Sequence, residues 1–229
     1  MDEKFYHQLL EELNPAKVQL LAVSKTRTPE EIQELYQLGQ RDFGENYVQE
    51  LADKQSRLPA DIRWHFIGHL QSNKVKYIAA FVYMIQGVDS LKLLLEIDKQ
   101  AKKSNRKIRC LLQVHIAKEE TKFGFSEPEL KDLMTTLLQS RSSGQGTNIE
   151  IAGLMGMASL TDNGDRIREE FRQLRSLFDQ LKAALPEDPV QTLSMGMSSD
   201  YQIAIEEGST MIRIGTALFG ERNYKKGQA

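Results

Sequence analysis

The stretch VQLLAVSKTRTPEEIQELYQLG (18–39) decides the fold, because it contains one complete strand–helix unit. Its first residues form a β-rich run that stops at Lys25. Thr28 then stands at the cap of a helix, with Pro29 and two acidic residues in the first turn, beside the positive end of the helix dipole. We expect this helix to end near Gly39.

The same unit recurs along the chain, so that eight strands alternate with helices. We expect strands at 18–24, 41–44, 64–68, 83–88, 108–116, 149–154, 190–194 and 210–215. We expect helices from about 28, 46, 72, 90, 128, 165 and 199, a last helical turn at 216–219, and an extra helix at 4–13 that plugs or flanks the barrel. The helix from 128 should end near 139, before a surface loop at 140–148. This alternation is typical of parallel βαβ units. A closed (β/α)₈ barrel of the TIM type fits better than an open doubly wound sheet, because no Gly-x-Gly-x-x-Gly turn follows the first strand.

Length and composition point to one domain over residues 1–229. A net charge of −2, with both signs mixed along the chain, gives no indication of a nucleic acid or membrane partner. The single cysteine, Cys110, excludes a disulfide framework within the chain, and no histidine pair has metal-ligand spacing. The first residues do not read as a secretory signal, so we expect a cytoplasmic protein; a plastid or mitochondrial form without its leader would look the same.

Lys25 is the sharpest candidate site residue, because the active site of such a barrel lies at the carboxyl ends of its strands. A lysine that ends an apolar strand loses hydration, which lowers the pKa of its amine and makes it nucleophilic. Such an amine can form a Schiff base with a carbonyl compound. The alternative is a lysine whose stem packs on the strand while its ammonium reaches solvent.

Small and hydroxyl residues follow the seventh and eighth strands, where these barrels often bind phosphate. They are SMGMS (194–198), which includes Ser194 and Ser198, and the pair Gly215 and Thr216. Backbone amides at a helix start and the Thr216 hydroxyl would face an anion. The alternative is that small residues here only permit tight turns. Together with Lys25, however, a phosphate site is what pyridoxal 5′-phosphate requires.

Arg213 lies inside the eighth strand, and it needs an acceptor if it points into the barrel. A pyridine nitrogen or a phosphate oxygen would serve, and a guanidinium beside the pyridine nitrogen would make the ring a weaker electron sink. The alternative is an ion pair with a carboxylate such as Glu45. We expect hydrogen-bonded core positions for His65 and His115, whereas His69 could line the mouth of the site.

Six motifs together resemble the pyridoxal phosphate homeostasis protein family. They are AVSKT (22–26), FGENYVQE (43–50), WHFIGHLQSNK (64–74), GLMGM (153–157), LSMGMSSD (193–200) and GSTMIRIGTALFGER (208–222). The resemblance implies a barrel like the N-terminal domain of alanine racemase, with Lys25 as the cofactor lysine. It also implies phosphate contacts from 194–198 and from Gly215 and Thr216, with Arg213 near the cofactor and Asn46 on the ring side.

The resemblance implies a protein that buffers or delivers pyridoxal phosphate and influences vitamin B6, amino-acid and keto-acid balance, with no catalytic residue and no metal. Apo-enzymes that use the cofactor are its expected partners, and a monomer is expected because the chain leaves no room for the second, dimerising domain of a racemase.

Two enzyme hypotheses compete with this reading. One is a low-activity amino-acid racemase, in which Tyr47, Tyr83 or His69 replaces the missing acid/base group. The other is a Schiff-base aldolase in which Lys25 attacks a phosphorylated sugar without any cofactor.

Overall fold

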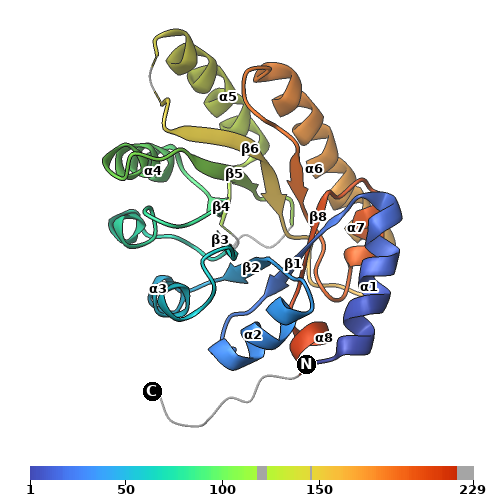
Figure 1. Ribbon diagram of the computed structural model, residues 1–229. Coiled ribbons are helices and arrows are strands. Elements are labelled where there is room, and N and C mark those ends of the chain that lie inside the picture. Colours follow the sequence, from blue (N-terminus) through green and yellow to red (C-terminus); the bar gives the residue numbers. More distant parts are fainter. Residues whose placement is uncertain (118–122, 145, 221–229) are drawn as a thin grey trace, which may run out of the picture.

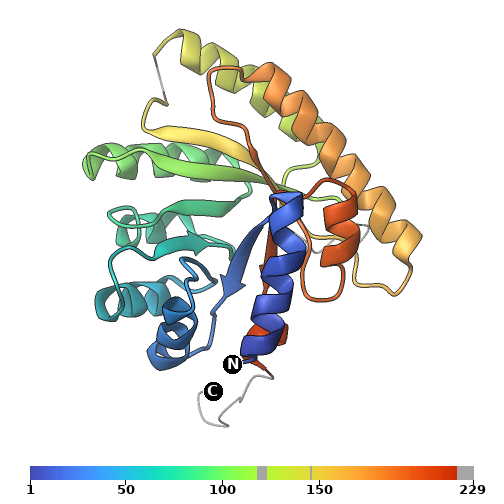
Figure 2. The ribbon, with the colours of Figure 1, turned by 45° about the vertical axis from the view of Figure 1, so that its right-hand side comes forward.

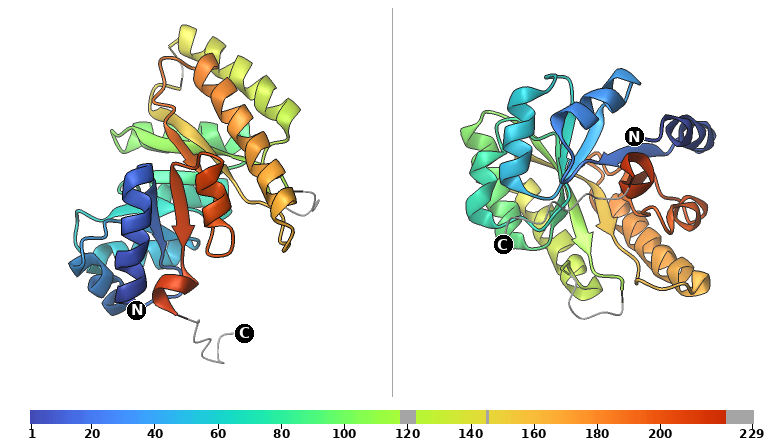
Figure 3. Two further views of the ribbon diagram at one scale, coloured as in Figure 1. Left: turned by 90° about the vertical axis from the view of Figure 1, so that its right-hand side faces the viewer. Right: turned by 90° about the horizontal axis from the view of Figure 1, so that it is seen from below.

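The computed structural model describes residues 1–117, 123–144 and 146–220, and it confirms the predicted barrel (Figure 1). Eight parallel strands close in chain order, and β1 pairs with β8 at the seam. The strands are β1 (Gln19–Val23), β2 (Asp42–Glu45), β3 (Arg63–Phe66), β4 (Met84–Val88), β5 (Ile108–Val114), β6 (Ile149–Gly156), β7 (Thr192–Ser194) and β8 (Met211–Ile214). Seen from below, the helices surround the strands (Figure 3).

The helices follow the strands in the expected order. They are α1 (Glu3–Ala16), α2 (Pro29–Gln37), α3 (Val48–Arg57), the 3₁₀ helix η1 (Ser72–Tyr77), α4 (Leu91–Lys103), α5 (Glu127–Ser142), α6 (Gly164–Ala184), α7 (Tyr201–Glu206) and α8 (Thr216–Phe219). Among the described helices, none combines the length and the hydropathy needed to cross a bilayer.

Local sequence explains why α2 begins where it does. The Thr28 side chain accepts a hydrogen bond from the Glu31 amide, and the Glu31 side chain accepts one from the Thr28 amide. This capping box, with Pro29 in the first turn, satisfies amide groups that a helix start leaves without partners. The start of α2 therefore confirms the prediction from the sequence.

Three elements differ from the sequence prediction. The segment after β3 forms only a six-residue 3₁₀ helix. Helix α5 continues to Ser142, into the segment expected to be a loop. Strand β7 is only three residues long, and residues 190–191 lie outside it.

Helix α1 flanks the barrel and does not plug it (Figure 2). It packs against α8 and β1, and the Asp2 amide donates to the carbonyl oxygen of Leu218. Its buried face, which includes Tyr6, Leu9 and Leu13, joins the main hydrophobic core. The N-terminal helix therefore covers the seam where β1 meets β8.

The interior of the barrel is more polar than its outside. The large hydrophobic core lies between the strands and the helices, whereas a separate small apolar cluster consists of Met84, Leu111, Ala152 and Met155. Polar side chains of β2, β3, β4, β7 and β8 are also buried and bond across the barrel; they are Asp42, His65, Gln86, Ser194 and Arg213. Each buried polar group needs a partner, and these groups supply partners for one another.

Candidate functional site

A cavity of about 280 Å³ opens at the carboxyl ends of the strands. Its lining comes from both sides of the β1–β8 seam and from β2, β3, β6 and β7. The lining residues are Val23, Lys25, Asn46, Ile67, Met155, Met157, Met197, Ser198, Ser199, Arg213, Gly215 and Thr216. Six of the seven residues predicted from the sequence therefore line one cavity, and only Ser194 does not.

Lys25 follows β1 by two residues and is half-buried in the cavity wall. The chain turns sharply next to it, since Thr26 has a φ of 66° and the Arg27 amide donates to the carbonyl oxygen of Ser24 at 3.0 Å. This turn at the rim of the barrel therefore fixes the direction in which the Lys25 side chain leaves the backbone.

Two charged side chains of α3 hold this turn in place. The Lys54 ammonium donates to the carbonyl oxygen of Ser24 at 2.8 Å, and the Thr26 amide donates to the Glu50 carboxylate at 2.6 Å. Lys54 also pairs with Glu50 at 2.6 Å and with Glu45 at 2.7 Å. The backbone on both sides of Lys25 is thus anchored by one ion-pair cluster.

Sequence reasoning missed this cluster. Lys54 is three residues after the buried Leu51 and therefore lies on the buried face of α3, where a lysine is unusual. That spacing, together with Glu50 one turn earlier, was the signal that could have revealed it.

Glu45 is fully buried at the end of β2. Burial raises the pKa of its carboxyl group to about 7, although the ion pair with Lys54 and the Ser24 hydroxyl bond act in the opposite direction. The ion pair with Arg213 that the sequence left open is not present, because Glu45 bonds to Lys54 and Ser24 instead.

Arg213 forms part of the cavity floor and is 5% exposed. Its Nη1 donates to the carbonyl oxygen and the hydroxyl of Ser194, both at 2.8 Å, and its Nη2 donates to the carbonyl oxygen of Gly156 at 2.9 Å. A guanidinium has five donor hydrogens, so two have no acceptor among the described residues and can serve a ligand in the cavity. Burial lowers the pKa of Arg213 to about 10, with the Asp200 charge opposing it, so the group remains a cation at neutral pH.

Ser194 lies beneath the cavity and is fully buried. Its hydroxyl donates to Gln86 Oε1 at 2.8 Å while it accepts from Arg213. The structure therefore places Ser194 as a support of Arg213.

Hydroxyl and amide groups gather on the side of the cavity formed by β7 and β8. Ser198 and Thr216 are exposed to it, and Thr216 begins α8, whose first amides have no acceptor within the helix. Gly196 shapes the neighbouring turn: its φ is 97°, and a Cβ there would lie 2.6 Å from the Ala204 Cβ. The Met197 amide on this side is already bonded to the Asp200 carboxylate at 2.6 Å, so the Ser198 and Thr216 hydroxyls and the first amides of α8 are the donors that suit an anionic ligand.

Asn46 lines the opposite side of the cavity. Its Oδ1 atom is buried and has no hydrogen-bond partner among the described residues. A buried acceptor without a partner is costly, so this oxygen indicates that a ligand donor belongs beside it. A ligand that combines an electrophilic carbonyl, an anionic group and a hydrogen-bond donor therefore fits the groups that line the cavity.

The three candidate acid/base residues lie elsewhere. Tyr83 precedes β4 and so lies at the opposite end of the barrel, where Arg109 donates to its hydroxyl. His69 bonds to Asp89 at 2.8 Å and stacks on Phe123, and Tyr47 is 60% exposed on a neighbouring cavity. None of the three lines the cavity that holds Lys25. No group of three or more metal-ligating side chains occurs in the part of the chain that the structure describes.

Comparisons with known proteins agree on one family. The profile of the family described as "Alanine racemase, N-terminal domain" matches residues 6–223. A "Pyridoxal phosphate homeostasis protein" of Aquifex aeolicus is 44% identical over 210 residues, covering 90% of this chain and 87% of the relative. Its counterpart in Pasteurella multocida is 42% identical over 214 residues, covering 91% and 88%.

A solved structure agrees with these relatives in fold. PipY of Synechococcus elongatus, in a structure described as having PLP bound, superposes with a TM-score of 0.85 at 37% identity, covering 95% of this chain and 99% of that one. The structure of the same protein without PLP superposes with a TM-score of 0.87.

Proposed function

The chain belongs to the pyridoxal phosphate homeostasis protein family, and on that premise we propose that it binds pyridoxal 5′-phosphate in the cavity at Lys25 and buffers or delivers it. Through this binding the protein takes part in vitamin B6, amino-acid and keto-acid homeostasis. We propose no catalytic turnover at the site.

One observation carries the proposal: an amine, hydroxyl groups and a guanidinium line the same cavity. Bound pyridoxal phosphate supplies a reactive aldehyde and an electron-withdrawing ring. Lys25 would hold the cofactor through its amine, a group that can react with an aldehyde. The turn anchored by Lys54 and Glu50 holds that amine at the cavity wall.

The remaining groups would hold the other parts of the cofactor. Ser198, Gly215 and Thr216 donate to the phosphate from the β7 and β8 side, and Asn46 accepts a donor on the ring side. Arg213 presents its two remaining donor hydrogens from the floor, with Ser194 fixing its position. The phosphate contact assigned to Ser194 from its sequence position is thereby replaced, in this proposal, by an indirect contribution.

The racemase alternative lacks support at the site, because its candidate acid/base residues do not line the cavity. A carrier needs reversible binding and an accessible site, and the exposed Ser198 and Thr216 give the cofactor a route out. We propose a cytoplasmic monomer whose partners are apo-enzymes that use the cofactor. A solution mass measurement of the loaded protein checks the monomer.

Titration of the apo-protein with pyridoxal phosphate tests binding. The wild type should gain visible absorption to one equivalent, whereas Lys25→Ala should gain none beyond that of free cofactor. Lys99→Ala is the matched control, since Lys99 lies on α4 and is 62% exposed. A colourless wild type would refute the proposal, as would equal absorption in Lys25→Ala.

A transfer experiment tests delivery. The loaded protein is mixed with an excess of an apo-enzyme, and the recovery of enzyme activity is followed in time. Recovery faster than the spontaneous release of cofactor into buffer supports delivery. Recovery at the release rate limits the protein to buffering.

A further inference from the structure

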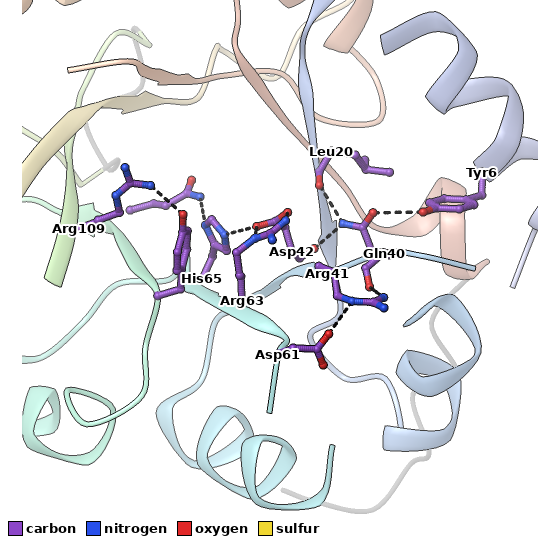
Figure 4. A network of polar contacts seen from close by, with 11 residues as sticks. Tyr6, Leu20, Gln40, Arg41, Asp42, Asp61, Arg63, His65 and Arg109 are labelled. Carbon is purple, nitrogen blue, oxygen red and sulfur yellow. Dashed lines mark hydrogen bonds and ion pairs between the residues drawn. The ribbon is translucent and has the colours of Figure 1, made fainter. Parts of the chain in front are cut away.

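A chain of buried side chains crosses the barrel below the cavity. Arg213 donates to the Ser194 hydroxyl at 2.8 Å, and that hydroxyl donates to Gln86 Oε1 at 2.8 Å. Gln86 Nε2 lies 3.0 Å from His65 Nδ1, and His65 Nε2 lies 3.0 Å from Asp42 Oδ1. Each of the five residues is at most 5% exposed, so water does not compete for these bonds. Figure 4 shows the end of this chain at His65 and Asp42.

The chemistry of the end group fixes the direction of every bond. A guanidinium can only donate, so the Ser194 oxygen accepts from Arg213, and its own hydrogen is available to Gln86 Oε1 at 2.8 Å. The Gln86 carbonyl is then the acceptor, and its amide nitrogen donates to His65 and to Met211 Sδ.

The state of His65 follows from that direction. Its Nδ1 accepts from an amide that has no lone pair to offer, so Nδ1 carries no proton and the proton is on Nε2. Nε2 donates to Asp42, which also accepts from the Arg63 guanidinium through both of its oxygens. The pKa of Asp42 is held well below its usual range by the Arg63 and His65 hydrogen bonds, against the effect of burial.

The other charges near His65 also favour its neutral form. Burial lowers the pKa of His65, and the positive charges of Arg63 and Arg109 act in the same direction, against Asp42. The Tyr83 ring packs on the imidazole at 5.3 Å between centroids.

We propose that Ser194, Gln86, His65 and Asp42 form a directed hydrogen-bond chain that positions Arg213 on the cavity floor, with His65 held as the neutral tautomer protonated on Nε2. The chain has a cation at one end and an anion at the other, and each bond polarises the next in the same sense. Gln86, His65 and Asp42 are therefore positioning residues for Arg213, although none of them lines the cavity. The role of Arg213 toward a bound pyridine ring or phosphate rests on the proposed function. The hydrogen-bond chain that positions Arg213 does not rest on it.

The tautomer is measured in the apo-protein by nitrogen-resolved NMR of the histidine rings, with the His65 signals assigned through His65→Asn. We expect unprotonated Nδ1 and protonated Nε2, unchanged between about pH 5 and pH 8. A proton on Nδ1, or a cationic ring at neutral pH, would overturn the proposal even if the protein binds pyridoxal phosphate.

Gln86→Glu is the decisive variant, because it keeps the side-chain shape and replaces the amide donor by an acceptor. The imidazole then lies between two carboxylates, so His65 should carry a proton on both nitrogens at neutral pH. An unchanged His65 signal would show that Gln86 does not set the tautomer. Gln86→Met preserves the volume without either partner atom, and it should leave His65 neutral with its proton on Nε2, because the Asp42 carboxylate still accepts from that nitrogen.

Cofactor binding tests the effect on Arg213. Ser194→Ala removes one acceptor of the guanidinium, and we expect the Kd for pyridoxal phosphate to rise by about tenfold. Asp42→Asn, at the far end, should raise it less. Because both cut the same chain, the double variant should bind no more weakly than Ser194→Ala alone, whereas independent sites would multiply the two effects. Multiplied effects would overturn the positioning role, and a wild type without binding would refute the proposed function alone.

Discussion

At the scale of single residues, the position of Lys25 depends on a cluster of charged side chains that lies far from it in the sequence, namely Glu45, Glu50 and Lys54. Lys54 lies with 3% of its side chain exposed between two carboxylates and the carbonyl oxygen of Ser24. A buried charge without its partner costs far more than the pair contributes. The cluster therefore couples the stability of the barrel to the shape of the turn at Lys25.

Lys54→Ala should lower the free energy of unfolding by about 3–5 kcal/mol, because it leaves Glu45 buried without its cation. Urea unfolding measures the change. Lys99→Ala, which loses only an exposed pair at 3.4 Å, should change stability by less than about 0.5 kcal/mol. Equal losses of unfolding free energy in the two variants would show that the buried ion pairs of Lys54 do not stabilise the protein.

Glu45 gives the protein a pH dependence of known sign. Its folded-state pKa, about 7, lies above its ordinary value of 4.5, so the folded state holds the proton more tightly. Its stabilising contribution is fully present below the unfolded pKa and is lost as the pH rises through about 7. Between about pH 5 and pH 8 the wild type should lose about 3 kcal/mol relative to Glu45→Gln, measured by urea unfolding at each pH. Parallel curves for the two proteins would show that Glu45 does not titrate in this window.

Site residues were predictable from the sequence only where their position at the carboxyl end of a strand determines which other residues they meet. Lys25, Asn46, Gly215 and Thr216 follow strands of a parallel barrel within two residues, and such positions meet at one rim. The partners of Arg213 were not predictable, because they depend on the register of β8 against the neighbouring β7 and on the position of the end of β6.

At the scale of elements, β6 contains an irregularity that shapes the barrel wall. Cys110 pairs with Ile151 and Leu111 with Gly153, so Ala152 is an extra residue in β6. Gly153 has a φ of 148°, and a Cβ there would lie 1.8 Å from the carbonyl oxygen of Thr192. Only glycine allows β7 to approach this closely.

Gly153→Ala should therefore lower the free energy of unfolding by about 3 kcal/mol or more, because alanine disfavours a φ of 148° and its Cβ would force the backbone away from Thr192. The matched control is Gly164→Ala at the start of α6, where the nearest atom to an added Cβ is 3.6 Å away. That variant should change stability by less than about 1 kcal/mol in either direction. Thermal unfolding compares the two, and a stable Gly153→Ala protein would contradict the assigned bulge.

Helix starts were the most predictable feature of the elements. Thr28 caps α2 as the sequence indicated, and Ser90 caps α4 in the same way, because capping depends on residues only three positions apart. The shortness of β7 and the 3₁₀ form of η1 arise from packing between distant segments, which local patterns do not contain.

At the scale of the whole molecule, the closed barrel separates two ends. Lys25 and Arg213 open to the cavity at one end, whereas Tyr83 and Arg109 meet at the other. Eight alternating strands and helices sufficed to predict this architecture, since few topologies bury eight parallel strands. The polar interior was not predicted beyond the buried positions of His65 and Arg213.

The lining of the Lys25 cavity predicts no racemase activity. Exchange of the α-hydrogen of alanine with solvent deuterium, followed by NMR, should be no faster with the loaded wild type than with free pyridoxal phosphate. The reason is that neither Tyr47, His69 nor Tyr83 lines the cavity with Lys25. Exchange that is faster than with free cofactor, and that Lys25→Ala abolishes, would contradict this prediction and support the racemase hypothesis.

The central claim, that Lys25 holds pyridoxal phosphate, is tested most directly by reductive trapping. The loaded protein is treated with borohydride, digested, and mapped by mass spectrometry. The account predicts a stable phosphopyridoxyl group on the peptide that contains Lys25, at one equivalent, and none in Lys25→Ala. A label of equal yield on another lysine, or the absence of any label in the wild type, would contradict it.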